Sequence, residues 1–90
     1  MNDRERFIYY AKSNGIDPAV LGKKIKMPRG SMVIIGQRVH GDRPIIVKAH
    51  TRKLAMPIHT LRKYMMQDKS TRKFLNMESE QVNVDLWFKS

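Results

Sequence analysis

The residues best able to do chemistry in this sequence are its lysines and arginines, which are concentrated in the middle of the chain. Residues 23–73 contain fourteen basic residues against Asp42 and Asp68, whereas residues 1–22 are neutral and residues 74–90 carry a net charge of −2. A field of one sign attracts a polyanion and releases its counterions on contact, while a surface needed only for solubility mixes both signs. The distribution favours nucleic acid as the partner, duplex DNA ahead of RNA, with an acidic protein as the alternative.

The candidate nucleic-acid contacts fall into small groups along this basic segment. They are Lys23, Lys24, Lys26, Arg29, Arg38, Arg43, Lys48, Arg52, Lys53, Arg62 and Lys63. Several are expected at turns, where a long side chain reaches a phosphate backbone without distorting a strand. Phosphate contacts position a protein but carry no sequence information, so the pattern does not reveal a target sequence.

Catalytic and metal-binding patterns are weak. His40, His50 and His59 are not at metal-ligand spacing, and an acid–base pair within the basic segment would need Asp42 or Asp68 to act with a histidine. The chain has no cysteine, which excludes disulfides and thiolate ligands. We therefore expect a protein that is not an enzyme, with no cofactor and no bound metal.

Aromatic side chains offer a different mode of binding, because they can stack on unpaired bases. The candidates are Tyr9, Tyr10, Tyr64 and Trp87. A domain of this size needs most of its aromatic residues in the core, so stacking is the less favoured mode. Trp87 is the best candidate, because the alternation of residues 82–88 places it opposite the apolar side chains.

The bulk properties are those of one small globular domain spanning residues 1–90. The chain has ninety residues and is 41% hydrophobic, which is enough for a thin core. No apolar run approaches the roughly 20 residues of a membrane span, and the N-terminus lacks the apolar segment of a signal peptide. Together with the absence of cysteine, this predicts a cytoplasmic protein without a membrane partner.

Local signals predict helices near the N-terminus. Asn2 and Glu5 match a capping box, which predicts a helix over 3–13 that stops at Gly15. Asp17 followed by proline is a second start signal, which predicts a short helix over 18–25. The expected fold therefore begins with a helical pair.

Strand signals follow the helical pair. Residues 32–35 and 45–47 are rich in Val and Ile and predict an antiparallel pair, with a further turn at 51–53 and a third strand at 54–56. A helix opened by Pro57 follows, and then a turn capped by Asp68 or Ser70. Residues 82–88 alternate strictly and predict a closing strand. The expected class is α+β: a helical pair, a small barrel-like antiparallel sheet, one or two further helices and a C-terminal strand.

Residues 18–32 (PAVLGKKIKMPRGSM) resemble the helix-turn-helix of phage-repressor-like DNA-binding proteins. In that motif a leucine followed by a small residue lies on the first helix, where this chain has Leu21 and Gly22. The resemblance implies a recognition helix through residues 29–35, with Arg29 and Ser31 in the major groove.

Residues 29–66 support the opposite interpretation, because they are similar to small barrels of the KOW or Tudor type. The similarity lies in short Val- and Ile-rich strands, tight turns and a proline after the last strand. Such barrels bind RNA, DNA or proteins of the transcription and translation machinery. A third resemblance, of residues 41–47 (GDRPIIV) to the strand entry of MazF-type ribonuclease toxins, implies an RNA-cleaving enzyme instead.

Overall fold

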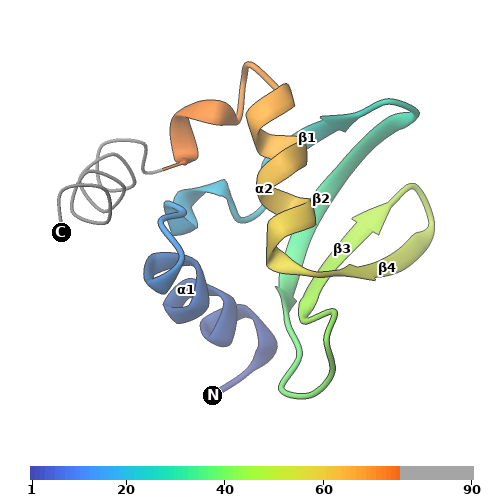
Figure 1. The fold of residues 1–90 in the computed structure, drawn as a ribbon. Coiled ribbons are helices and arrows are strands. Elements are labelled where there is room, and N and C mark those ends of the chain that lie inside the picture. Colours follow the sequence, from blue (N-terminus) through green and yellow to red (C-terminus); the bar gives the residue numbers. More distant parts are fainter. Residues whose placement is uncertain (76–90) are drawn as a thin grey trace, which may run out of the picture.

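The computed structural model describes residues 1–75, which form an α+β fold (Figure 1). Its elements are helix α1 (Asp3–Ser13), the 3-10 turn η1 (Pro18–Val20), strands β1 (Lys24–Met27), β2 (Gly30–Gln37), β3 (Ile45–Ala49) and β4 (Arg52–Met56), helix α2 (Ile58–Gln67) and the 3-10 turn η2 (Arg72–Phe74). The four strands form one antiparallel sheet in chain order. The predicted α+β class is confirmed, and the strand predicted for 82–88 lies outside the described residues.

Helix α1 forms as its local signals predict. Asn2 accepts a hydrogen bond from the backbone N–H of Glu5, and the Glu5 side chain accepts from the backbone of Asn2, which completes the capping box. Gly15 has φ +71° beyond the helix end, as expected for a left-handed stop. The helix over 3–13 is therefore confirmed.

The predicted second helix over 18–25 is wrong, and the N-terminal helical pair does not form. Asp17 does cap a turn, because its side chain accepts from the N–H of Ala19, but that turn ends at Val20. Gly22 then takes φ +84°, and the chain enters β1. Ile25 is buried between two exposed lysines, which is the period of two of a strand.

Strand β2 shows the conformation of a segment that the sequence left open between a strand and a recognition helix. Residues 30–37 form a strand that pairs with β1 on one side and β3 on the other, so no recognition helix forms through 29–35. A register shift between Ile34 and Gly36 marks a β-bulge. A Cβ added at Gly36 would lie 2.8 Å from the Cβ of Asp3, so this glycine lets α1 approach the sheet closely.

The remaining elements follow the predicted order with shifted boundaries. The expected third strand is β4, but it starts at Arg52, so the turn lies at His50 and Thr51 rather than at 51–53. Helix α2 begins directly after Pro57, as predicted. Asp68 follows α2, and its side chain accepts hydrogen bonds from Ser70 and Thr71.

The core lies between the sheet and the two helices. Phe7 and Ala11 of α1 and Leu61 and Met65 of α2 pack with the inward side chains of the strands. The buried apolar strand residues are Ile25, Met32, Ile34, Ile45, Val47 and Met56. Since successive side chains on a strand point to opposite faces, the residues between them form a second face of the sheet, which we call the outer face.

Candidate nucleic-acid interface

Four of the predicted contact residues lie together on the outer face. Lys24 is paired with Val33, Val33 with Lys48, and Lys48 with Lys53, so these residues form one row across all four strands. We call it the lysine row. Its three lysines are exposed and Val33 is half-buried. Adjacent strands are about 4.8 Å apart, so the row spans roughly 14 Å. Lys26 lies on the same face, two residues along β1.

Within residues 1–75, no ion pair neutralises the charges of the lysine row. The four strands contain five basic residues and no acidic residue. None of the five forms an ion pair within residues 1–75. Lys48 and Lys53 are directly opposite each other, and like charges in that position destabilise a sheet. The outer face therefore carries a repulsion that a bound anion would relieve.

The two hairpin turns bring two more predicted contacts together at one end of the sheet (Figure 1). Arg29 lies in the β1–β2 turn, and Arg52 follows the β3–β4 turn. The turns touch, because a Cβ added at Gly30 would lie 3.7 Å from Nε2 of His50. His50 has φ +56°, a conformation that costs a residue with a side chain about 1–2 kcal/mol. Cations from opposite hairpins thus flank a strained histidine.

The other five predicted contacts are dispersed. Arg38 and Arg43 are exposed at the β2–β3 loop, at the far end of the sheet from the turns. Lys23 is exposed before β1, and Lys63 is exposed on α2. Arg62 is half-buried and donates to the backbone carbonyl of Asn14, and burial lowers its pKa from the usual value. Its guanidinium links α2 to the end of α1, which is a structural task.

A groove of about 530 Å³ lies where the β1 edge of the sheet meets the C-terminal end of α2. We call it the β1 groove. Asp68 lies at this groove and is 6% exposed. Its carboxylate accepts from the backbone N–H of Lys26 at 2.9 Å and from the hydroxyl of Thr71 at 3.0 Å. Ser70 donates to it through its N–H at 3.2 Å and its hydroxyl at 3.0 Å.

These hydrogen bonds give Asp68 a structural role, because they join β1 to the turn after α2. The backbone N–H of Lys26 is the largest cause that lowers the pKa of Asp68, and Ser70 and Thr71 add to it, while burial acts in the opposite direction. A carboxylate that accepts this many donors is held in its charged form. It also covers the edge of β1, which would otherwise present an unpaired N–H.

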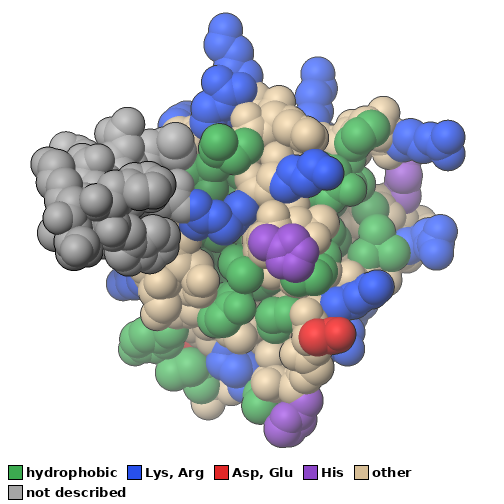
Figure 2. Space-filling model, in the orientation of Figure 1, with side chains coloured by type: hydrophobic (Ala, Val, Ile, Leu, Met, Phe, Trp, Pro, Cys, Tyr) green, Lys and Arg blue, Asp and Glu red, His purple; other side chains and the backbone are tan. Residues whose placement is uncertain are grey.

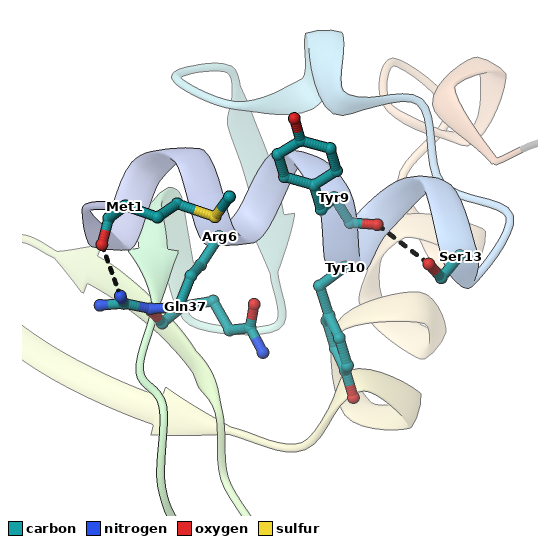
Figure 3. A pocket seen from close by; sticks show the side chains of 6 residues that line it. All are labelled: Met1, Arg6, Tyr9, Tyr10, Ser13 and Gln37. Atoms are coloured by element: carbon teal, nitrogen blue, oxygen red, sulfur yellow. Dashed lines mark hydrogen bonds between the residues drawn. The ribbon is translucent and has the colours of Figure 1, made fainter.

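In the described part of the chain, the aromatic residues lie outside the strands that carry the lysine row. A shallow pocket of about 350 Å³ on α1 is lined by Tyr9 and Tyr10, with Arg6 and Gln37 beside them (Figure 3). Arg6 is engaged there, because it donates to the carbonyls of Gln37 and Met1. The pocket reaches the end of β2 opposite the hairpin turns. Tyr9 is 62% exposed, but it is not interleaved with the lysine row.

Within residues 1–75, the three histidines considered as catalytic or metal-binding residues do not lie together in one site. His40 and His50 lie in different connections between strands, and His59 is exposed on α2. Within this part of the chain no group of three His, Cys, Asp or Glu residues is placed to hold a metal ion. Trp87 and its predicted strand lie outside the described residues.

Basic side chains are also abundant on the face of the molecule that carries α2. Figure 2 shows lysine and arginine side chains projecting from much of this face, and acidic side chains are scarce on it. At the edge formed by the hairpin turns, basic side chains and a histidine project together. The positive charge therefore extends from the end of the sheet onto the α2 face.

Comparison with known proteins identifies no relative from which a function could be inferred. No family model, curated protein or solved structure matches this chain. None of the helices in residues 1–75 has the length and apolar character needed to cross a membrane.

Sequence reasoning identified the lysines of the outer face but missed Lys69, which lines the β1 groove beside Lys24 and Lys26. It also missed the position of His50 between Arg29 and Arg52. The signal available for Lys69 was the stretch Asp68-Lys69-Ser70-Thr71, in which an aspartate precedes two hydroxyl residues and so predicts a tight turn. Nothing local indicates that this turn docks on β1.

Proposed function

We propose that this protein binds duplex DNA without catalysing a reaction, through phosphate contacts made by the outer face of its sheet. The observation that carries the proposal is the cross-strand pair Lys48–Lys53 in a row that also contains Lys24, on strands without a single carboxylate. Such a pair opposes folding. Its presence is accounted for if phosphates lie over it.

Duplex is favoured over single-stranded nucleic acid by what accompanies the lysines. Proteins that hold single strands combine positive charge with aromatic stacking, which contributes about 1–3 kcal/mol per base. The lysine row contains a valine, and no aromatic residue occurs on β1, β2, β3 or β4. Contact with phosphates alone matches this composition, and it fits a duplex, whose bases are already paired.

Further features support a role for this domain in transcription. Residues 29–66 resemble KOW- and Tudor-type barrels, and the antiparallel order of β1–β4 is compatible with a small barrel-like sheet. A role for such a domain as a small cytoplasmic regulator of transcription is consistent with the absence of cysteine. Phosphate contacts by themselves imply little preference among DNA sequences.

The test is the substitution Lys48→Glu, which separates binding from folding. A glutamate opposite Lys53 replaces repulsion with attraction, so the free energy of unfolding should rise by about 0.2–1 kcal/mol. Duplex affinity at low salt should fall by about tenfold, equally for all sequences, because phosphate contacts are lost. Fluorescence anisotropy with duplex DNA, single-stranded DNA and structured RNA measures the affinity, and a thermal melt measures the stability.

Arg4→Glu is the matched control, because it changes the net charge by the same amount at an exposed position in the first turn of α1. It should leave duplex affinity within about twofold, since Arg4 belongs neither to the lysine row nor to the β1 groove, and a negative charge is tolerated at a helix N-terminus. Equal losses for Lys48→Glu and Arg4→Glu would show that only total charge matters. No duplex binding by the unsubstituted protein at low salt would refute the proposal.

A further inference from the structure

The β1 groove has a composition that the lysine row does not explain. Its walls carry three lysines from two separate segments and three neutral polar side chains: Lys24, Lys26, Ser31, Gln67, Lys69 and Ser70. Its volume of about 530 Å³ lies within the range of pockets that hold small ligands. Lys24 belongs both to the groove and to the lysine row, so the two surfaces are continuous.

The carboxylate that lines the groove among the described residues does not neutralise these lysines. Asp68 lies at the groove, but its two carboxylate oxygens accept from the Lys26 backbone N–H, from Ser70 and from Thr71. Within residues 1–75 neither Asp68 nor any other carboxylate forms an ion pair with Lys24, Lys26 or Lys69. The ammonium groups therefore line the groove while its one carboxylate is committed to holding β1 against the turn after α2.

Two neutral side chains complete the polar lining. The Ser31 hydroxyl and the Gln67 amide form no hydrogen bond with another group in the described part of the chain. Both can donate to an anionic oxygen. Lys24 and Lys26 lie two residues apart on β1, so their Cα atoms are about 6.6 Å apart, and Lys69 faces them from the segment after α2. Donors thus approach the groove from two sides.

We propose that the β1 groove is a phosphate-binding site, which holds a phosphate of the nucleic-acid backbone where that backbone continues past Lys24. This inference rests on the proposed function and adds Lys69, Ser31 and Gln67 to the contact surface. The same groups would donate equally well to the oxygens of a free nucleotide's phosphate or of inorganic phosphate, because they recognise only the phosphate group. The experiment below distinguishes a phosphate of the nucleic-acid backbone from a free phosphate compound.

The test compares Lys69→Glu with the control Arg4→Glu, which carries the same change of charge. Lys69 is exposed, so neither substitution should change stability by more than about 0.5 kcal/mol, which a thermal melt checks. Lys69→Glu should lower duplex affinity by about tenfold and reduce the steepness of the salt dependence by about one phosphate, whereas Arg4→Glu should not. If Lys69→Glu lowers the melting temperature, Lys69→Gln replaces it with a smaller expected loss.

Amide chemical shifts locate the ligand. Addition of a short DNA duplex, and separately of inorganic phosphate, should move the backbone amide resonances of Ser31 and Ser70. Shifts with the duplex, together with the loss in Lys69→Glu, support backbone phosphate as the occupant. Shifts with inorganic phosphate in a protein that does not bind duplex support the groove as a site for a free phosphate compound and refute the proposed function.

One set of results would contradict the phosphate site in the β1 groove but not the proposed function. If duplex binds, Ser31 and Ser70 stay unshifted, and Lys69→Glu binds as well as Arg4→Glu, then the groove is not a phosphate site, while the outer face remains the interface. If neither ligand shifts these resonances and no duplex binds, both proposals are wrong.

Discussion

In helix α1, acidic and basic side chains alternate and contact one another, whereas on the strands every charged side chain is a lysine or an arginine. Asp3 and Arg6 of α1 form an ion pair, and Arg6 also donates to the carbonyl of Gln37 on β2. On the sheet, Lys48 is opposite Lys53 and has no counter-charge within residues 1–75. The charges of α1 contribute to folding, while those of the sheet oppose it.

This difference separates two uses of the same residue types. A charge that is satisfied within the fold needs no other explanation. A row of unsatisfied like charges lowers stability, and a bound polyanion would offset that loss. For this reason the outer face, rather than the more numerous exposed charges elsewhere, is the surface that we assign to a ligand.

The largest expected effect is that of salt on binding. If the four lysines of the outer face each neutralise one phosphate, log affinity should fall with log salt at a slope of about −3.6, which is more than about a hundredfold between 50 and 200 mM. The melting temperature should change little over the same range, because the exposed Arg6–Asp3 pair contributes about 0–1 kcal/mol. Anisotropy and calorimetry in matched buffers check both. An affinity that is flat with salt would remove the contrast between the two regions.

A smaller effect is expected from Asp68, the acidic residue beneath the basic surface. Asp68→Asn replaces an oxygen that accepts hydrogen bonds with an NH₂ group, and at least one buried donor loses its partner. The free energy of unfolding should fall by about 1–3 kcal/mol, and the loss of a negative charge among lysines acts in the same direction. Chemical denaturation at neutral pH measures this loss. A stabilised Asp68→Asn protein would mean that the cost of burying the charged carboxylate outweighs its hydrogen bonds.

The pH dependence of the same variant follows from the lowered pKa of Asp68. A carboxyl whose pKa is lower in the folded state stabilises the fold above its unfolded pKa of about 3.9, and that contribution disappears as pH falls through the folded pKa. The difference in stability between the unsubstituted protein and Asp68→Asn should therefore be full at neutral pH and shrink below about pH 3.9. A difference that is constant down to strongly acidic pH would contradict this.

The smallest effect is expected at the cap of α1. Asn2→Ala removes the side-chain oxygen that accepts from the N–H of Glu5, which should cost about 1 kcal/mol of stability. Duplex affinity should be unchanged when the protein is folded, because the capping residues act within α1. Urea denaturation and anisotropy on the same preparation test the two halves of this statement. Weaker duplex binding at full folding would place α1 in the interface.

Where the sequence was informative, the determining interactions were local. The capping box of α1 involves residues three apart, and the Val- and Ile-rich runs of β2 and β3 favour strands by their own side chains. The error at residues 18–25 has the same origin. Asp17 and Pro18 are a true helix start, but Gly22 and the pairing of Ile25 with Met32 end it after one turn. A start signal specifies where a helix begins and not how long it lasts.

The sequence by itself determined the amount of positive charge and its concentration in residues 23–73. Tertiary structure decided which cations share a surface. The pairing of β1 to β4 places Lys24, Lys48 and Lys53 in one row, and the bond from the Lys26 N–H to Asp68 joins residues 42 apart and brings Lys69 to the groove. Register and docking depend on contacts between distant segments, and a shift of one residue would turn these side chains to the other face.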